Sequence, residues 1–100
     1  MAIVRYQIIL SPEAVRQLRG LRADVRATVR DSLDRYPRCR PTRESRSRIK
    51  RLRGMSKPQY RLRVDDVRVH YDVDRDMVAV LAIVRKSEAD AWLGEIGEVE

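Results

Sequence analysis

The chain has 100 residues, of which 43% are hydrophobic and 37% charged, and its formal net charge is +7. This length suits one domain with one core, and the apolar share is too high for a disordered chain. Because Cys39 is the only cysteine, an internal disulfide and a cysteine-based zinc site are both excluded. The N-terminus lacks the long apolar run of a signal peptide and no segment reaches transmembrane length, so we expect a cytoplasmic protein without a membrane partner.

Charge is segregated along the chain. Residues 38–63 contain eleven basic side chains and one acid, whereas residues 71–100 contain three basic side chains and eight acids. A basic block of this kind attracts polyanions through counterion release, so we expect a nucleic-acid or acidic-protein partner. A merely solvated arginine-rich surface is the alternative, because arginine is favoured over lysine throughout the chain.

The first third of the chain predicts one strand and two helices. Alternating apolar side chains predict a strand over residues 3–10. Ser11 and Pro12 then suit the cap and the first position of a helix, which Gly20 ends. Apolar residues at spacings of three and four predict a second helix over residues 21–36.

The remaining chain begins with a long connection. Residues 38–58 hold few large hydrophobic side chains and several helix or strand breakers, so we expect a basic connecting loop there. Three strands joined by short turns follow, at residues 59–64, 67–73 and 77–84. A last helix and a tail are expected over residues 87–100, with Ser87 near the start of the helix. The apolar side chains that would face the sheet are Ala91, Trp92 and Ile96.

The resulting order of elements is β-α-α-β-β-β-α, within one domain that spans residues 1–100. Short turns between the last three strands favour an antiparallel meander. We therefore expect an α+β fold in which an N-terminal helical hairpin packs on a small antiparallel sheet.

Two neighbouring strands carry the most informative pattern. Apolar and polar side chains alternate in residues 60–64 and 67–73, so each strand has one apolar and one polar face. The polar faces would bring together Arg61, Arg63, Arg68 and His70. Guanidinium groups on a rigid sheet suit a phosphate-rich partner. The alternatives are arginines that face solvent or pair with Asp72, and a histidine with a structural role only.

Five short motifs follow one another along the chain: IILSPEA at residues 8–14, LRG at 52–54, YRLRV at 60–64, VRVHYDV at 67–73 and LAIVRK at 81–86. Together they resemble the RelE/ParE superfamily of small bacterial toxins over nearly the whole chain. The resemblance implies a RelE-like, microbial-ribonuclease-type fold with a helical hairpin on a curved antiparallel sheet. The RelE branch, which we favour, cleaves mRNA in the ribosomal A site without a metal ion or other cofactor.

The chemistry of the RelE branch is attack of a ribose 2′-hydroxyl on the adjacent phosphate, which leaves a 2′,3′-cyclic phosphate and a 5′-hydroxyl. Such a reaction needs a base, cations for the charge on the phosphorane, and an acid for the leaving oxygen. By position, the resemblance assigns the cationic roles to Arg61, Arg63, Arg68 and Lys86. RNA contacts are expected from Arg85 and Trp92 by position, and from three residues of the basic block, Arg51, Arg53 and Lys57.

Two of these positions depart from the family pattern. Arginine hardly ever gives up its proton, so Arg61 and Arg63 would stabilise charge without moving protons. Trp92 stands where the family often has tyrosine, and its indole can stack on a base but has no phenolic proton; a core position is the alternative. The first candidate for a proton carrier is His70, which titrates near neutral pH when unperturbed, and weaker candidates are Tyr60 and Lys86.

Other functions remain open at the level of sequence. A ParE-like inhibitor of DNA gyrase shares the fold, and the missing tyrosine favours it. A catalytically degenerate RNA-binding module is a third possibility. Either toxin function implies a cognate RelB-like antitoxin, often acidic, as a partner, and the RelE branch adds the ribosome and its mRNA.

Overall fold

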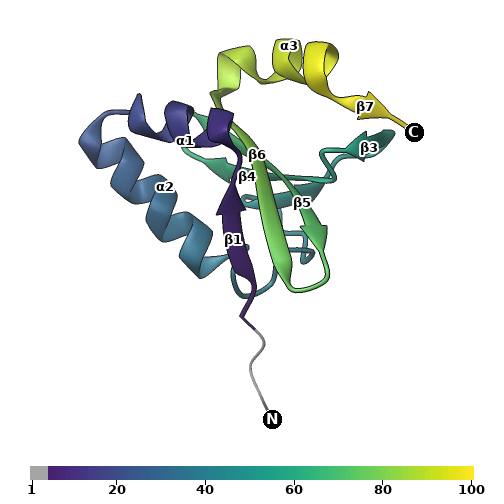
Figure 1. Ribbon diagram of the computed structural model, residues 1–100, viewed down its shortest axis with the longest axis horizontal. Coiled ribbons are helices and arrows are strands. Elements are labelled where there is room, and N and C mark those ends of the chain that lie inside the picture. The colour runs from purple at the N-terminus through teal and green to yellow at the C-terminus, as the bar shows by residue number, and fades with distance from the viewer. Residues whose placement is uncertain (1–4) are drawn as a thin grey trace.

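The computed structural model describes residues 5–100 and has the α+β architecture that the sequence predicts (Figure 1). The helices are α1 (Pro12–Arg19), α2 (Ala23–Arg35) and α3 (Lys86–Ile96). The strands are β1 (Gln7–Leu10), β2 (Ile49–Arg51), β3 (Met55–Lys57), β4 (Tyr60–Val64), β5 (Val67–Asp74), β6 (Met77–Arg85) and β7 (Glu98–Val99). Among the described residues, no helix has the length and apolar content needed to cross a membrane.

Five strands form the main sheet in the order β1-β6-β5-β4-β2. The predicted meander of β4, β5 and β6 is antiparallel, and β2 joins it antiparallel to β4. The expectation of a wholly antiparallel sheet is wrong at one edge, because β1 pairs with β6 in parallel. This pairing follows from the long excursion between the two strands, which lets β1 enter the sheet in the same direction as β6.

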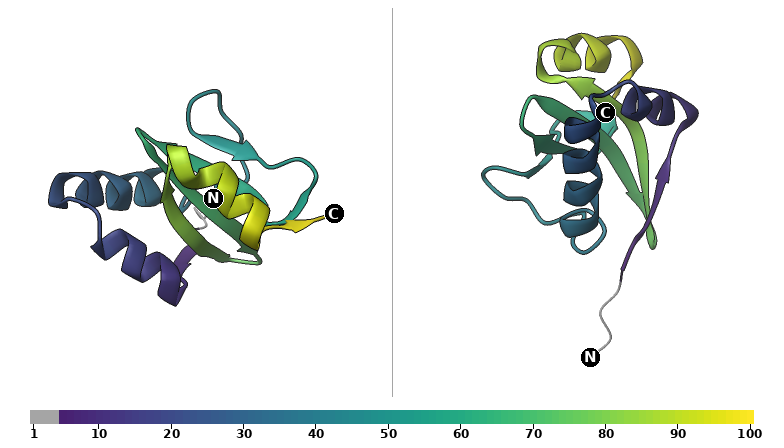
Figure 2. Two further views of the ribbon diagram at one scale, coloured as in Figure 1. Left: turned by 90° about the horizontal axis from the view of Figure 1, so that it is seen from above. Right: turned by 90° about the vertical axis from the view of Figure 1, so that its left-hand side faces the viewer.

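The helices cover the two faces of the sheet unequally. The hairpin of α1 and α2 lies on one side, and α3 lies across another part of the sheet, beside α1 (Figures 1 and 2). The main core forms between the hairpin and the sheet, where Val29 and Leu33 of α2 pack with Leu62, Val69 and Tyr71. A smaller cluster forms under α3, with the members Ala82, Val84, Ala89 and Trp92.

Local sequence signals explain where the hairpin begins and ends. The Ser11 hydroxyl accepts a hydrogen bond of 3.0 Å from the Ala14 N–H, so it caps α1 as predicted, and Gly20 ends that helix. The second helix starts at Ala23, two residues later than predicted. Of the strand predicted over residues 3–10, the part from Gln7 onward is confirmed, and Ile3 and Val4 lie outside the described residues.

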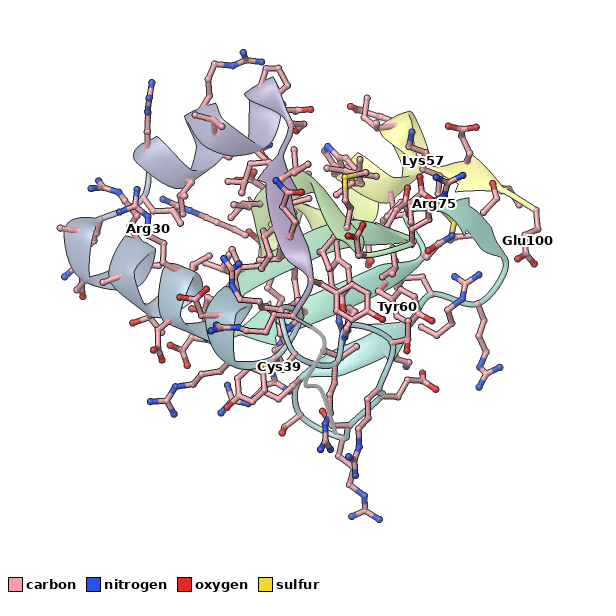
Figure 3. The ribbon with its side chains drawn as sticks, turned by 60° about the horizontal axis from the view of Figure 1, so that its bottom comes forward. Arg30, Cys39, Lys57, Tyr60, Arg75 and Glu100 are labelled. Carbon is pink, nitrogen blue, oxygen red and sulfur yellow. The ribbon has the colours of Figure 1, made fainter. Side chains whose placement is uncertain are left out.

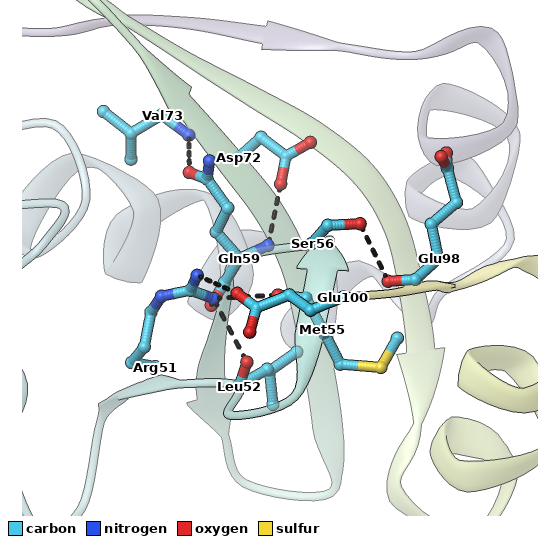
Figure 4. A network of polar contacts seen from close by, with 9 residues as sticks. All are labelled: Arg51, Leu52, Met55, Ser56, Gln59, Asp72, Val73, Glu98 and Glu100. Atoms are coloured by element: carbon cyan, nitrogen blue, oxygen red, sulfur yellow. Dashed lines mark hydrogen bonds and ion pairs between the residues drawn. The ribbon is translucent and has the colours of Figure 1, made fainter.

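The connection predicted over residues 38–58 contains two short strands. Ile49 is buried and β2 pairs with β4, while β3 pairs with β7, which is formed by the predicted tail. Gly54, with φ of 79°, makes the turn between β2 and β3. The Arg51 guanidinium fastens this region, because it donates to the Gln59 carbonyl at 2.7 Å and lies 3.7 Å from the Glu100 carboxylate (Figure 4).

The last helix differs from its prediction in two respects. It begins at Lys86, and no side chain caps it, so the expected cap near Ser87 is wrong. Trp92 is buried as predicted, but Ala91 and Ile96 are exposed and Ala89 takes the second buried position. The helix therefore touches the sheet through a narrow strip of small and aromatic side chains.

Candidate functional site

The predicted gathering of arginines on one sheet face is present. The face opposite the helical hairpin carries Arg61 and Arg63 on β4 and Arg68 on β5. Arg63 pairs directly with Arg68 across the strands, and Arg61 pairs with His70. Directly opposite residues on antiparallel strands place their Cβ atoms about 5 Å apart, so the three guanidiniums start from neighbouring points on a rigid floor.

The three arginines repel one another. Burial and the neighbouring Arg63 lower the pKa of Arg61 below that of an ordinary arginine. Burial, Arg61 and Arg63 also lower the pKa of Arg68, and Asp66 opposes this shift. A cluster of mutually repelling cations is stabilised when an anion binds between them.

No carboxylate within residues 5–100 forms an ion pair with these three side chains. The alternative that they pair with Asp72 is not what is found, since this carboxylate accepts the Gln59 N–H at 2.7 Å (Figure 4). Within the described residues, the positive charge of the face is therefore not neutralised by an internal carboxylate.

Arg68 is the least accessible of the three, with 5% of its surface exposed. Its Nη1 donates to the carbonyl oxygens of Asp65 at 2.8 Å and Val67 at 3.1 Å. The first of these residues has a φ of 50°, in the left-handed region, so Arg68 helps to hold the tight turn between β4 and β5. Its charge contributes to the cationic face, but its Nη1 group is already used for hydrogen bonds inside the protein.

His70, the first candidate for a proton carrier, is not accessible in this structure. Its side chain is fully buried and stacks on Trp92, with ring centroids 5.0 Å apart and planes at 13°. Burial, followed by the charges of Arg61 and Arg68, lowers the pKa of His70 to about 4. The histidine is therefore neutral at pH 7 and is packed against Trp92 inside the protein.

The helix α3 closes the half of the face that lies over β5 and β6. Trp92 is 9% exposed and packs on the sheet as part of the smaller core, so as it stands it offers no platform to an RNA base. Within residues 5–100, four buried nitrogens under and beside this helix lack a hydrogen-bond partner: Arg61 Nε, His70 Nδ1, His70 Nε2 and Trp92 Nε1. Unpaired buried polar atoms are costly, so this helix covers the face at a reduced gain in stability.

The other predicted residues lie at the edges of the face or away from it. Arg85 and Lys86 are exposed at the start of α3, where they line a hollow together with Asp66. The Lys86 N–H donates to the Asp66 carbonyl at 2.7 Å, which places this lysine beside the turn that Arg68 holds. Tyr60 stacks on Tyr71 on the helical-hairpin side, so it is not part of the site.

The RNA contacts predicted in the basic block are dispersed. Arg51 is used for internal hydrogen bonds and Arg53 is exposed in the turn that follows β2. Lys57 is exposed on β3, at the end of the molecule where Glu100 also lies (Figure 3). Among the described residues, no group of three metal-ligating side chains is close enough to hold a metal ion.

Solved structures resemble this chain closely in fold. The toxin–antitoxin complex RelBE2 from Mycobacterium tuberculosis gives a TM-score of 0.67 at 22% identity, over 84% of this chain and 94% of that chain. The RelB–RelE antitoxin–toxin complex from Methanococcus jannaschii gives 0.66 at 14% identity, over 84% of this chain and 96% of that chain. This chain has a RelE-type toxin fold.

The archaeal RelE–RelB complex from Pyrococcus horikoshii OT3 agrees, with a TM-score of 0.62 at 22% identity over 82% of this chain and 96% of that chain. No protein-family model matches the chain, and no curated protein matches it in sequence. The RelE-type fold therefore rests on the arrangement of helices and strands, at sequence identities that establish the fold alone.

Proposed function

We propose that this protein is the toxin of a type II toxin–antitoxin system and a ribosome-dependent mRNA endonuclease that acts without a metal ion. The observation that carries the proposal is the cationic face, in which Arg61, Arg63 and Arg68 lie together without a carboxylate partner among the described residues. The RelE-type fold supports it, because the neighbouring structures are RelE toxins in antitoxin complexes. A toxin that acts on ribosomes would work in the cytoplasm.

In the proposed reaction the 2′-oxygen of a ribose forms a bond to the adjacent phosphorus and the bond to the 5′-oxygen breaks. The 2′-hydroxyl loses a proton and the 5′-oxygen gains one, which leaves a 2′,3′-cyclic phosphate and a 5′-hydroxyl. The guanidiniums of Arg61 and Arg63 would stabilise the negative charge on the phosphorane. Because these arginines keep their protons, the cationic face lowers the barrier by electrostatics.

The proton that reaches the 5′-oxygen needs a different donor. His70 is buried and neutral at pH 7, so it has no proton to donate there without a change of structure. We assign the donor role to Lys86, the exposed cation at the start of α3 beside the turn that Arg68 holds. The 2′-hydroxyl would lose its proton to water or to a group of the ribosome.

Mapping of mRNA ends on programmed ribosomes tests this proposal. Purified toxin should produce new 5′-hydroxyl ends at the codon in the A site, and EDTA should leave the yield unchanged. Lys86→Ala should slow cleavage, and Lys86→Arg should restore only the charge, because arginine is a poorer acid. Intact mRNA on ribosomes that carry bound toxin would overturn the proposed cleavage.

A second candidate is a ParE-like inhibitor of DNA gyrase, and one observation favours it. His70 and Trp92, which were candidates for proton transfer and RNA stacking, are both buried and stack on each other. A cationic face whose histidine and tryptophan are both buried suits binding better than cleavage. Inhibition of gyrase supercoiling by a preparation that leaves ribosome-bound mRNA intact would favour this candidate.

The partner of either toxin would be a RelB-like antitoxin with an acidic toxin-binding segment. This part of the proposal rests on the net charge of +7 and on the solved complexes with the same fold. Charge complementarity makes association faster and tighter at low salt. We expect the affinity of the complex to fall as salt is raised, and a salt-independent affinity would exclude an electrostatic interface.

A further inference from the structure

A hollow lined by arginines lies on the opposite side of β2 from the cationic face. It has a volume of about 450 Å³ and lies between the end of α2 and the loop that leads into β2. Four arginines line it, together with Tyr36, Cys39, two serines and Ile49; the arginines are Arg35, Arg40, Arg43 and Arg48. We call this hollow the arginine pocket; the labelled Cys39 marks its position in Figure 3.

The charge of the arginine pocket is not balanced from within. Its lining includes no carboxylate, whereas each of four other hollows on the described surface includes at least one. Arg35 has a partner, Asp31, at 3.0 Å. Arg40, Arg43 and Arg48 form no ion pair with any carboxylate in residues 5–100.

Contacts inside the pocket hold part of it in place. The Arg48 guanidinium lies over the Tyr36 ring, 4.7 Å from its centroid, which fixes one cation in the wall. The Ser45 hydroxyl oxygen accepts the N–H groups of Arg48 at 3.1 Å and Ile49 at 3.3 Å. The O–H group of this serine donates no hydrogen bond among residues 5–100, so it can donate to an anion.

The pocket and the cationic face meet at one sheet edge. The main-chain N–H of Arg63 donates to the Arg48 carbonyl at 2.8 Å, so the two surfaces share a backbone contact. Lys50 pairs with Arg61 on the cationic face, while buried Ile49 lies on the pocket side of the same strand. Strand β2 is an edge strand and only three residues long, so a flexible polyanion can pass around it from one surface to the other.

We infer that the arginine pocket is a second phosphate-binding site, which holds the backbone of single-stranded RNA that continues around β2 from the cationic face. A regular row of phosphates suits two separated groups of arginines, and arginine binds phosphate through two parallel hydrogen bonds. The inference rests on the proposed function for the identity of the polyanion as RNA. Phosphate binding in the arginine pocket does not depend on whether the protein cleaves RNA.

Salt-dependent RNA binding tests the inference. A fluorescent single-stranded oligoribonucleotide is titrated with the full chain, without ribosomes, at several salt concentrations. The test variant is Arg40→Gln/Arg43→Gln/Arg48→Gln, and the matched control is Arg16→Gln/Arg19→Gln/Arg30→Gln. The control removes three exposed charges from α1 and α2, so both variants have the same net charge.

The pocket variant should lower the slope of log K against log salt by about 2, because each phosphate contact to a single strand contributes about 0.7. The control should keep the slope of the parent chain. Equal losses in both variants would mean that only net charge matters, and would overturn the inference. Because Arg48 also stacks on Tyr36, the double variant Arg40→Gln/Arg43→Gln must show about two thirds of the effect.

Two further outcomes separate this inference from the proposed function. If the slope of log K against log salt in the pocket variant equals that of the parent chain, the inferred phosphate site is overturned even if the parent chain cleaves mRNA on ribosomes. A lowered slope would support the pocket even if cleavage is absent. Displacement of the RNA by poly-glutamate at equal charge concentration would assign the pocket to an acidic protein and overturn the RNA assignment.

Discussion

The buried histidine makes the stability of this protein depend on pH. His70 is fully buried against Trp92, and its pKa falls from 6.5 to about 4 on folding. Between these two values the unfolded chain binds the proton and the folded chain does not, so protonation favours unfolding. The stability that the neutral imidazole provides is complete above pH 6.5 and is lost as the pH falls toward 4, below which the effect is constant.

The size of the effect follows from the shift in pKa. A shift from 6.5 to about 4 corresponds to a total of about 3 kcal/mol, at 1.36 kcal/mol for each pH unit. Most of this loss of stability falls between pH 7 and pH 5, where the protein can be measured. Over that interval a single site with pKa values of 6.5 unfolded and about 4 folded loses about 2 kcal/mol.

Urea denaturation at pH 7, 6 and 5 measures this loss in the parent chain and in His70→Phe. Phenylalanine keeps an aromatic ring against Trp92 and cannot titrate. All other ionisable groups are shared, including Asp72, whose pKa is raised by burial, so their contributions cancel in the difference between the two proteins. His70→Gln provides a second non-titrating variant with a polar side chain.

The parent chain should lose about 2 kcal/mol more than His70→Phe between pH 7 and pH 5. Parallel loss of stability in the two proteins would refute the account of His70 as a buried neutral residue. An NMR titration of the imidazole gives an independent check, because a midpoint near 6.5 in the folded protein would contradict its burial.

Two further substitutions test the packing that holds the site. Ser11→Ala should lower the free energy of unfolding by about 2 kcal/mol, as measured by urea denaturation. The reason is that the hydroxyl accepts the Ala14 N–H at the start of α1 and also donates to the Leu81 carbonyl at 2.9 Å. An unchanged midpoint would contradict this double role. Tyr71→Phe should lower the free energy of unfolding by about 1–3 kcal/mol, because the buried Pro41 carbonyl loses the hydroxyl that donates to it at 2.6 Å. An unchanged free energy of unfolding would mean that a water molecule replaces the hydroxyl.

Most of the fold was predictable because its main elements carry local signals. The alternation in β4 and β5 placed Arg61, Arg63 and Arg68 on one face, and this assignment is confirmed. The short strands β2, β3 and β7 were missed because two or three residues show no periodicity. Their pairing partners lie far along the chain, so only the folded structure reveals them.

The candidate site was predictable as a set of charges but not as an accessible surface. Alternation shows which side of a strand a residue takes, and the position of α3 over that side depends on tertiary packing. His70 was therefore expected to be available, and instead it stacks on Trp92 under α3. The arginine pocket was missed for a related reason, since the loop before β2 folds back toward the end of α2 without a sequence pattern.

The rate of mRNA cleavage by Arg63→Ala tests the central claim most directly. Arg63 is exposed on the cationic face and its side chain has no internal hydrogen bond among the described residues, so its removal should leave the fold intact. Single-turnover cleavage on programmed ribosomes should fall about 10²–10³-fold, the loss typical of one charge-stabilising donor. Arg16→Ala, which removes an exposed arginine from α1, should cleave at the parent rate. Equal rates for Arg63→Ala and Arg16→Ala would contradict the assignment of the cationic face as the site of cleavage.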